Sequence, residues 1–188
     1  MGRLHVTALF LLSVAAFTLT LALRGETISW SWLAAAGIPS AAVTLVAAFF
    51  EREGWTLPFL YGWFVKRPDL RGKWQFTFQS NFEEDGQPVV GKGDYAVTQT
   101  WTSVIVKMDA ALSRGDHVSA QVENDGDGSF KLCGIFRNEA AMAERPKLGM
   151  HYGAYILRCP NERHPKRLEG EYWTDRGTAG SIVAERLP

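Results

Sequence analysis

Hydrophobic and polar positions follow two different patterns along the chain. Two long runs without a charged residue stand at the front, at Leu4–Leu23 and Ile28–Phe50. In helices that rise about 1.5 Å per residue they reach roughly 30 and 35 Å, enough to cross a bilayer core. After Asp69, apolar and polar residues alternate, which is typical of strands. The patterns predict a two-helix transmembrane hairpin over residues 1–54, an aromatic interfacial linker over 55–69 and a β domain over 70–188.

Each apolar run has an alternative interpretation. Leu4–Leu23, with Arg3 before it, also fits a cleaved signal peptide, although the run is long and has no clear A-x-A exit. Ile28–Phe50 also fits a buried helix, although few soluble helices of this length are apolar on every side. By the positive-inside rule, the basic residues after the second run predict a multi-pass membrane protein with both termini in the cytoplasm. These residues are Lys66, Arg67, Arg71 and Lys73.

Strand-like segments recur from Leu70 onward, with Gly, Asp, Asn and Pro in the breaks between them. Eight such segments with mostly short links predict an all-β, eight-stranded, up-and-down, lipocalin-like antiparallel barrel, because closing the sheet leaves no exposed edge. A two-sheet sandwich is the alternative. The segments are Arg71–Ser80, Gly91–Trp101, Ser103–Asp109, His117–Asn124, Ser129–Asn138, Gly149–Cys159, Arg167–Thr174 and Thr178–Arg186.

Alternation within each segment assigns one of its faces to the interior. The residues that it places inside include Trp74, Tyr95, Gln99, Trp101, Val118, Ala120, Val122, Phe136, Tyr155 and Tyr172. Polar and aromatic residues mix on the predicted inner face, so we expect a partly hydrophilic lumen with room for one small ligand. Apolar residues also occur on the predicted outer face, and they would mark an interface if they gather on one wall. They are Ile105, Ile135, Ile156, Trp173 and Val183.

Composition and motifs exclude several classes of function. The chain has 20 basic and 20 acidic residues, so electrostatics give no case for binding DNA or RNA. The four histidines are dispersed with no carboxylate in step with them, and no metal site is expected. No nucleophile motif or phosphate loop is present, so we expect neither an enzyme nor a cofactor. Cys133 and Cys159 are expected to be free thiols in a reducing compartment.

Ligand binding has more support than catalysis. Buried polar side chains need partners, and a ligand with ring faces and amide edges would offer stacking together with hydrogen bonds. A core whose polar groups satisfy one another is the alternative. Arg176, in the turn after the seventh segment, is either placed to reach a phosphate at the barrel mouth or simply exposed to solvent. The predicted ligand-contacting set is Trp74, Gln99, Trp101, His151, Tyr155, Tyr172, Thr174 and Arg176.

Four motifs follow the two predicted spans in a fixed order. They are R-G-K-W at Arg71–Trp74, G-x-G-x-Y-x-V-x-Q at Gly91–Gln99, H-x-G-x-x-x-L at His151–Leu157 and G-x-Y-x-T-x-R-x-x-x-G at Gly170–Gly180. Over nearly the whole chain, this order resembles the two-transmembrane β-barrel effectors associated with CD-NTase enzymes in bacterial CBASS anti-phage systems. One departure follows the fifth segment, where the family pattern is aromatic-x-asparagine-x-proline. Here Phe136–Ala140 lacks the proline, which leaves the ligand or interface role of that loop open.

The resemblance implies a sensor and an executor in one chain. A partner nucleotidyltransferase would make a cyclic dinucleotide on infection, and the cytoplasmic barrel would bind it. The chain would then oligomerise and disrupt the inner membrane, which kills the infected cell. Its partners would be the nucleotide, the lipid bilayer, the nucleotidyltransferase and further copies of itself.

Two other functions stay open from the sequence. One is a membrane-tethered, lipocalin-like carrier of a small apolar ligand, because the Gly72-x-Trp74 opening is similar to the lipocalin start, where the tryptophan closes the barrel floor. The other is a structural membrane adaptor whose barrel is filled by its own side chains.

Overall fold

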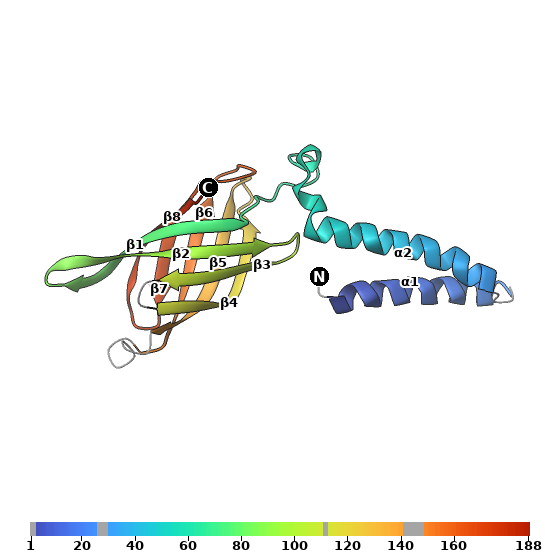
Figure 1. The fold of residues 1–188 in the computed structure, drawn as a ribbon, viewed down its shortest axis with the longest axis horizontal. Helices are drawn as coiled ribbons and strands as arrows, with labels where there is room; N and C mark the ends of the chain where they lie inside the picture. The colour runs from blue at the N-terminus through green and yellow to red at the C-terminus, as the bar shows by residue number, and fades with distance from the viewer. Residues whose placement is uncertain (1–2, 26–29, 111–112, 141–148) are drawn as a thin grey trace. The chain divides into compact units, whose positions relative to one another are not determined.

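The chain forms two compact units in a computed structural model that describes residues 3–25, 30–110, 113–140 and 149–188 (Figure 1). The first unit comprises residues 1–60 together with Thr100–Thr102. The second comprises Tyr61–Gln99 and Ser103–Pro188. The first unit is helical and the second contains the strands, so we describe each by itself.

Two helices and two short turns make up most of the first unit. α1 spans Arg3–Leu23 and α2 spans Trp30–Arg52, and both are rich in alanine, which favours helix formation. α1 ends before Gly25, whose φ of +75° is a left-handed conformation that glycine adopts without strain. Two 3-10 turns follow α2, η1 at Gly54–Thr56 and η2 at Pro58–Leu60.

The prediction of two membrane-spanning helices is wrong. Within the part of the chain that the structure describes, no helix is both long enough and apolar enough to cross a bilayer. The multi-pass inner-membrane localisation with both termini in the cytoplasm rested on those spans and is corrected with them.

The predicted antiparallel barrel of eight strands is confirmed. Each strand pairs with its neighbours in the sequence, and β1 also pairs with β8, which closes the barrel. We call the end where β1 begins and β8 ends the closed end, and the end where β1 ends and β6 begins the mouth. The strands are β1 (Gly72–Glu84), β2 (Gln87–Gln99), β3 (Val104–Ala110), β4 (Ser113–Asn124), β5 (Phe130–Ala140), β6 (His151–Cys159), β7 (Arg167–Thr174) and β8 (Ala179–Arg186).

Alternation along the strands places an apolar core inside the barrel, as predicted for Trp74 and Tyr155, which are at most 2 % exposed. Val118 is an exception, because it was predicted inside and is 63 % exposed. The ladder between β4 and β5 shifts register between His117 and Ser119. Such a bulge adds one residue to a strand and changes the phase of its alternation, so the extra residue falls on the outer face.

Large rings fit inside the barrel because their cross-strand partners are glycines. Tyr155 lies directly opposite Gly134, and Phe136 lies directly opposite Gly153. A Cβ at Gly134 would come within 2.4 Å of the Tyr155 ring, and one at Gly153 within 2.3 Å of the Phe136 ring. These rings therefore lie against the neighbouring strand, in space that any larger residue at either glycine would occupy.

Candidate functional site

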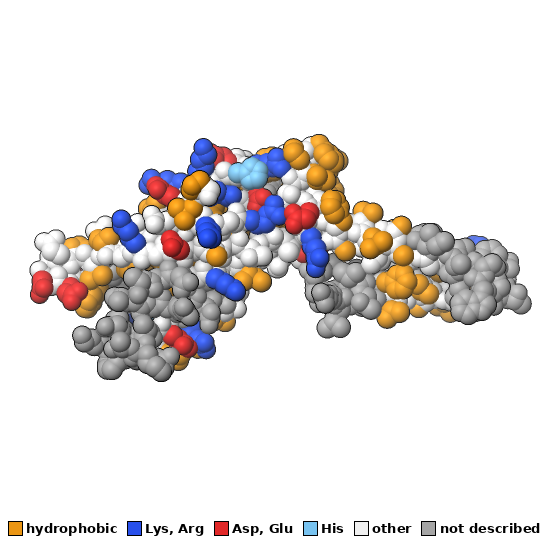
Figure 2. Space-filling view, viewed as in Figure 1, with side chains coloured by type: hydrophobic (Ala, Val, Ile, Leu, Met, Phe, Trp, Pro, Cys, Tyr) orange, Lys and Arg blue, Asp and Glu red, His pale blue; other side chains and the backbone are white. Residues whose placement is uncertain are grey.

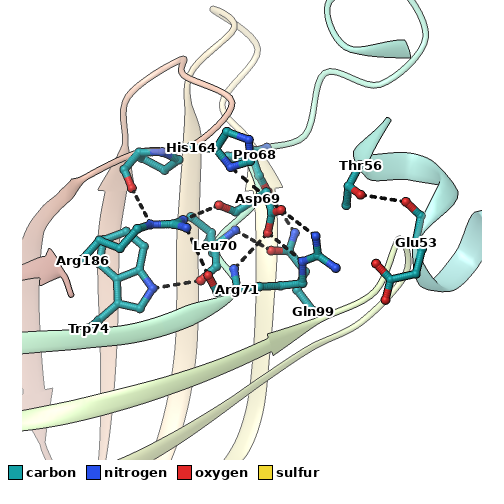
Figure 3. Close-up of polar contacts among 11 residues, drawn as sticks. Glu53, Thr56, Pro68, Asp69, Leu70, Arg71, Trp74, Gln99, His164 and Arg186 are labelled. Carbon is teal, nitrogen blue, oxygen red and sulfur yellow. Dashed lines mark hydrogen bonds and ion pairs between the residues drawn. The ribbon is translucent and has the colours of Figure 1, made fainter. Parts of the chain in front are cut away.

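The chain's own groups seal the closed end of the barrel (Figure 3). Trp74 is 1 % exposed, and its indole N–H donates a hydrogen bond of 2.8 Å to the carbonyl of Leu70. The guanidinium carbon of Arg186 lies 4.7 Å from the centroid of the Trp74 ring. The same guanidinium also donates hydrogen bonds to the carbonyls of Asp69, Arg71 and Pro165. Trp74 therefore forms the floor of the barrel.

Gln99 also belongs to the closed end. Gln99 is only 3 % exposed, and its Oε1 accepts a hydrogen bond of 2.8 Å from the backbone N–H of Leu70. Its Nε2 donates one of 3.0 Å to the carbonyl of Pro68. Both ends of the amide therefore bind the segment that leads into β1, which is the self-satisfied arrangement that the sequence left open (Figure 3).

The charges at the closed end are also matched. Arg71 and Asp69 form an ion pair with 2.9 Å between Nη2 and Oδ2. Burial raises the pKa of the Asp69 carboxyl, but the hydrogen bonds and the charge of Arg71 outweigh it and hold that pKa below its usual 3.8. The Arg71–Asp69 pair therefore leaves no unmatched charge for a charged group of a ligand.

Trp101 lies in the turn between β2 and β3 and belongs to the first unit. Its ring packs edge-on against Phe50, with 5.5 Å between the centroids. Its backbone N–H donates a hydrogen bond of 2.9 Å to the carbonyl of Glu51. The Glu51 carboxylate in turn accepts hydrogen bonds from the two threonines that flank Trp101. Trp101 therefore does not belong to the unit that contains the barrel, to whose interior alternation assigned it.

Aromatic rings occupy the middle of the interior. Phe76 and Tyr95 stack with 4.2 Å between centroids and 19° between ring planes. Tyr95 continues to Tyr155 at 6.2 Å, and Tyr155 to Phe136 at 6.4 Å. Burial raises the pKa of both tyrosine hydroxyls, so both are protonated at neutral pH. The interior is therefore aromatic at this level. Of the polar groups expected in the lumen, Gln99 lies at the closed end, whereas His151 and Thr174 lie toward the mouth.

Two buried polar atoms without a partner lie side by side at the mouth. Asn138 on β5 and His151 on β6 are directly opposite each other in the ladder. Among the residues that the structure describes, neither Oδ1 of Asn138 nor Nδ1 of His151 has a hydrogen-bond partner, although both atoms are buried. Leaving such an atom unpaired costs about 1–3 kcal/mol. A ligand that supplies both partners would recover that free energy.

The turn between β7 and β8 adds a cation to the mouth. Arg176 is exposed and donates a hydrogen bond of 2.6 Å to the carbonyl of Gly149, two positions before His151. Burial lowers the pKa of His151 below its usual 6.5, and the charge of Arg176 lowers it further; together they outweigh the Gly149 backbone and the charge of Asp175, which raise it. The imidazole is therefore neutral at neutral pH and offers one nitrogen acceptor and one N–H donor.

The structure divides the predicted ligand-contacting set into three groups. Trp74 and Gln99 lie at the closed end, and Trp101 lies in the first unit. The remaining members share the mouth-side half of the barrel: His151, Tyr155, Tyr172, Thr174 and Arg176. Whether any of these residues contacts a ligand stays a prediction.

Asn138 is the site residue that sequence reasoning missed. The signal was present, because Asn138 follows the inward-facing Phe136 by two positions and so falls on the same face. It also forms part of the aromatic-x-asparagine stretch whose role was left open. What the sequence did not supply was the register that sets Asn138 opposite His151.

Two further observations concern metal binding and surface depressions elsewhere in the described residues. In the described ranges, no three His, Cys, Asp or Glu side chains come close enough to hold a metal ion. A depression of about 370 Å³ lies at the closed end, away from His151. Its lining includes Tyr61, Lys66, Asn124, Phe130 and Asn161.

Comparison with protein-family models gives a match over most of the chain. The model of a family described as "Cap15, cyclic dinucleotide receptor domain" matches residues 65–186. This range contains all eight strands and every member of the predicted ligand-contacting set. No curated protein matches the chain.

Proposed function

The chain belongs to the family of Cap15 cyclic dinucleotide receptor domains, and from that premise we propose that the barrel mouth is where it binds its ligand. The family membership supports a CBASS effector with a cyclic dinucleotide as its ligand. The residues that hold the nucleotide and the events that follow binding are the proposal.

One observation carries the proposed site, namely the unpaired atoms of Asn138 and His151. The edge of a nucleobase presents an N–H donor beside a nitrogen or carbonyl acceptor. Asn138 Oδ1 would accept from the donor, and His151 would bond to the neighbouring group. The ring of Phe136, 8 % exposed and on the same face as Asn138, belongs to the buried apolar core beside this pair.

Arg176 supplies the charge that a dinucleotide needs. Charge-assisted hydrogen bonds from a guanidinium to phosphate are among the stronger ones in proteins. An apolar ligand, as in the lipocalin-like alternative, would leave Asn138 and His151 unpaired and Arg176 unused. The chemistry of the mouth therefore favours a nucleotide over a lipid.

Calorimetric titration of the full chain with cyclic di-AMP, cyclic di-GMP and 3′,3′-cyclic GMP–AMP tests the proposed site. Arg176→Ala is expected to weaken binding by about 1.5–3 kcal/mol, because it removes a hydrogen bond to a charged group. Arg167→Ala is the matched control, since Arg167 is also exposed but lies at the closed end, and it should bind as the parent does. Unchanged affinity in Arg176→Ala, or no heat from any of these nucleotides, would contradict the proposal.

Binding is further proposed to favour self-association of the chain. A ligand shifts an equilibrium only toward the form that it binds more tightly, so an assembled form must hold the nucleotide better. Light scattering of the full chain before and after addition of the nucleotide measures this directly. A molar mass that does not change at saturation would contradict it.

Membrane disruption and the partner nucleotidyltransferase follow only from the resemblance and stay predictions. Release of dye from vesicles of bacterial inner-membrane lipids, with the full chain and nucleotide added, tests the first. A nucleotidyltransferase gene beside the gene for this chain would support the second.

A further inference from the structure

The segment that leads into the barrel carries two exposed aromatic rings side by side. Trp63 is 70 % exposed and Phe64 is 57 % exposed. Their ring centroids lie 5.6 Å apart, so the two rings form one small apolar surface. Figure 2 shows hydrophobic side chains gathered over the segment that leads from α2 to β1. Apolar side chains that gather in this way mark an interaction surface, whereas single exposed ones do not.

These rings lie on a turn that is fixed to the barrel unit. The turn comprises residues Tyr61–Lys66, and we call it the aromatic turn. The N–H of Gly62, whose φ is +95°, donates a hydrogen bond of 2.9 Å to the carbonyl of Val65. Val65 is only 1 % exposed, so its side chain anchors the turn. The rings are therefore presented at a defined place.

The aromatic turn also forms one side of the depression at the closed end, whose volume is about 370 Å³. Tyr61, Gly62 and Lys66 line the depression from the turn. All of its described lining belongs to the second unit, and among these residues Lys66 is basic and none is acidic. The rest of this lining consists of Asn124, Gly128, Phe130 and Asn161.

Hydrogen-bond donors gather around the depression. The Oδ1 of Asn124 accepts a hydrogen bond of 2.8 Å from the N–H of Gly126, which leaves the Nδ2 of Asn124 to donate. The Nδ2 of Asn161 lies 3.4 Å from where a Cβ would stand on Gly128. Lys66 is exposed and, among the described residues, has no ion-pair partner. Donors beside a positive charge are suited to an anion such as phosphate.

The acidic residues nearest to the depression are matched by groups of their own. Asp125 forms an ion pair of 2.6 Å with Lys131. Asp127 accepts hydrogen bonds from within its own turn. Glu162 is followed directly in the chain by Arg163, which has the opposite charge. These carboxylates therefore leave the charge of Lys66 to attract an anion.

We propose that the aromatic turn and the depression together bind an anionic phospholipid at the surface of a bilayer. The lipid phosphate accepts hydrogen bonds from Lys66 and the two asparagine amides, and the rings of Trp63 and Phe64 enter the interface beside it. Tryptophan is enriched at the level of the lipid headgroups, because its ring is apolar and its N–H is polar. This contact is with the bilayer surface and involves no membrane-spanning helix.

The occupant is a lipid because only a lipid uses both parts of the site. Free phosphate would bind the donors and leave the rings in water, and an apolar partner would cover the rings and leave the donors unused. Between Gly54 and Pro68 the chain has no acidic residue, and its only charged residues are Lys66 and Arg67. Basic residues of this kind are attracted to anionic lipids. The turn also lies within residues 55–69, which the sequence predicts to be an interfacial segment.

A fluorescent label on the aromatic turn tests the proposal locally. Phe64→Cys in a Cys133→Ser background carries an environment-sensitive fluorophore, and Cys159 stays unlabelled because it is 1 % exposed. With vesicles of phosphatidylglycerol and phosphatidylcholine, the emission of the labelled full chain should shift to the blue. Phe82→Cys is the matched control, since Phe82 is also 57 % exposed but lies on β1 toward the mouth. No shift at position 64, or an equal shift at both positions, would overturn the proposal.

Substitution of the lysine tests the headgroup part of the site. Lys66→Ala should weaken binding of the full chain to the same vesicles about fivefold, because it removes one basic residue near the anionic surface. Lys92→Ala is the matched control, as Lys92 is also exposed but lies on β2 outside the depression. With vesicles of phosphatidylcholine alone, the two variants should bind alike. An equal loss in both variants with the anionic vesicles would contradict a headgroup site at Lys66.

Two further measurements separate the lipid from other occupants. A blue shift of the label at position 64 with inorganic phosphate alone would show a site for a soluble anion. A shift that grows with the concentration of the chain, without vesicles, would show that a second copy covers the rings. Either result would overturn the proposal. None of these experiments includes a nucleotide, so failure of the lipid site leaves the proposed site at the mouth unaffected.

Discussion

The two ends of the barrel differ in how their buried polar groups are hydrogen-bonded. At the closed end, the side chains of Trp74 and Gln99 bond to the segment that leads into β1, and Arg186 bonds to the same segment. At the mouth, Asn138 Oδ1 and His151 Nδ1 are buried without partners among the described residues. At both ends, inward-facing and outward-facing residues alternate along the same eight strands. The difference is whether the chain itself supplies the partners for the polar groups that it buries.

This contrast separates residues that stabilise from residues that bind. A polar group satisfied within the chain contributes to folding, whereas one left unpaired lowers stability until a ligand arrives. Substitutions at the closed end should therefore change the free energy of unfolding, and substitutions at the mouth should change affinity.

The largest effect is expected at the floor of the barrel. Trp74→Ala should lower the free energy of unfolding by about 3–5 kcal/mol, because it removes a fully buried ring and leaves a cavity. Trp173→Ala, whose ring is 46 % exposed on the outer wall, should cost about 1 kcal/mol or less. Urea unfolding monitored by far-ultraviolet circular dichroism, which reports the backbone and does not rely on tryptophan fluorescence, measures both losses. Similar losses in the two variants would show that Trp74 is not the structural floor.

The two inward-facing amides provide the sharpest comparison between the ends. Gln99→Leu leaves the Leu70 N–H and the Pro68 carbonyl unpaired, so it should lower the free energy of unfolding by about 1–3 kcal/mol for each group. Asn138→Leu removes an oxygen that has no described partner, so it should change stability less and weaken nucleotide binding about tenfold. Urea unfolding and calorimetry on both variants test this. An Asn138→Leu variant that is destabilised as much as Gln99→Leu, with unchanged affinity, would reverse the assignment.

A smaller effect is expected in the dependence of stability on pH. The folded pKa of His151 is lowered, so the unfolded chain binds the proton more readily, and stability should fall as pH drops below about 6.5 toward the folded pKa. The folded pKa of Asp69 is also lowered, but for a carboxyl this stabilises the fold above pH 3.8 and is lost only below it. Thermal unfolding between pH 7 and 3 should show two separate steps, and His151→Gln should remove the upper one. An unchanged upper step would assign it to another group.

Alternation was enough to predict the eight strands and most of the interior, including Trp74, Tyr95 and Tyr155. It failed where the phase changes, as at Val118, since a bulge of one residue leaves little trace in the sequence. It also failed at Trp101, because the strand ends at Gln99 and the next two residues belong to a turn. The prediction of helical spans also failed, since no helix in the described part of the chain is long and apolar enough to cross a membrane.

The candidate site could be predicted only in part, for a different reason. Gln99 and Asn138 are both amides on the inner face, and nothing local distinguishes them. Only the tertiary structure shows that residues 68–70 reach Gln99, while the described residues offer Asn138 Oδ1 no partner. His151 and Arg176 were predicted together from the motif order, and the structure places them near each other at the mouth.

Nuclear magnetic resonance of the full chain with ¹⁵N-labelled histidines tests the central claim most directly, because histidines lie at both ends of the barrel. His151 lies at the mouth, and His164 lies beside Asp69 at the closed end. On titration with the cyclic dinucleotide that binds, the imidazole nitrogens of His151 should shift to saturation while those of His164 stay in place. A saturating shift at His164 with no change at His151 would contradict the account.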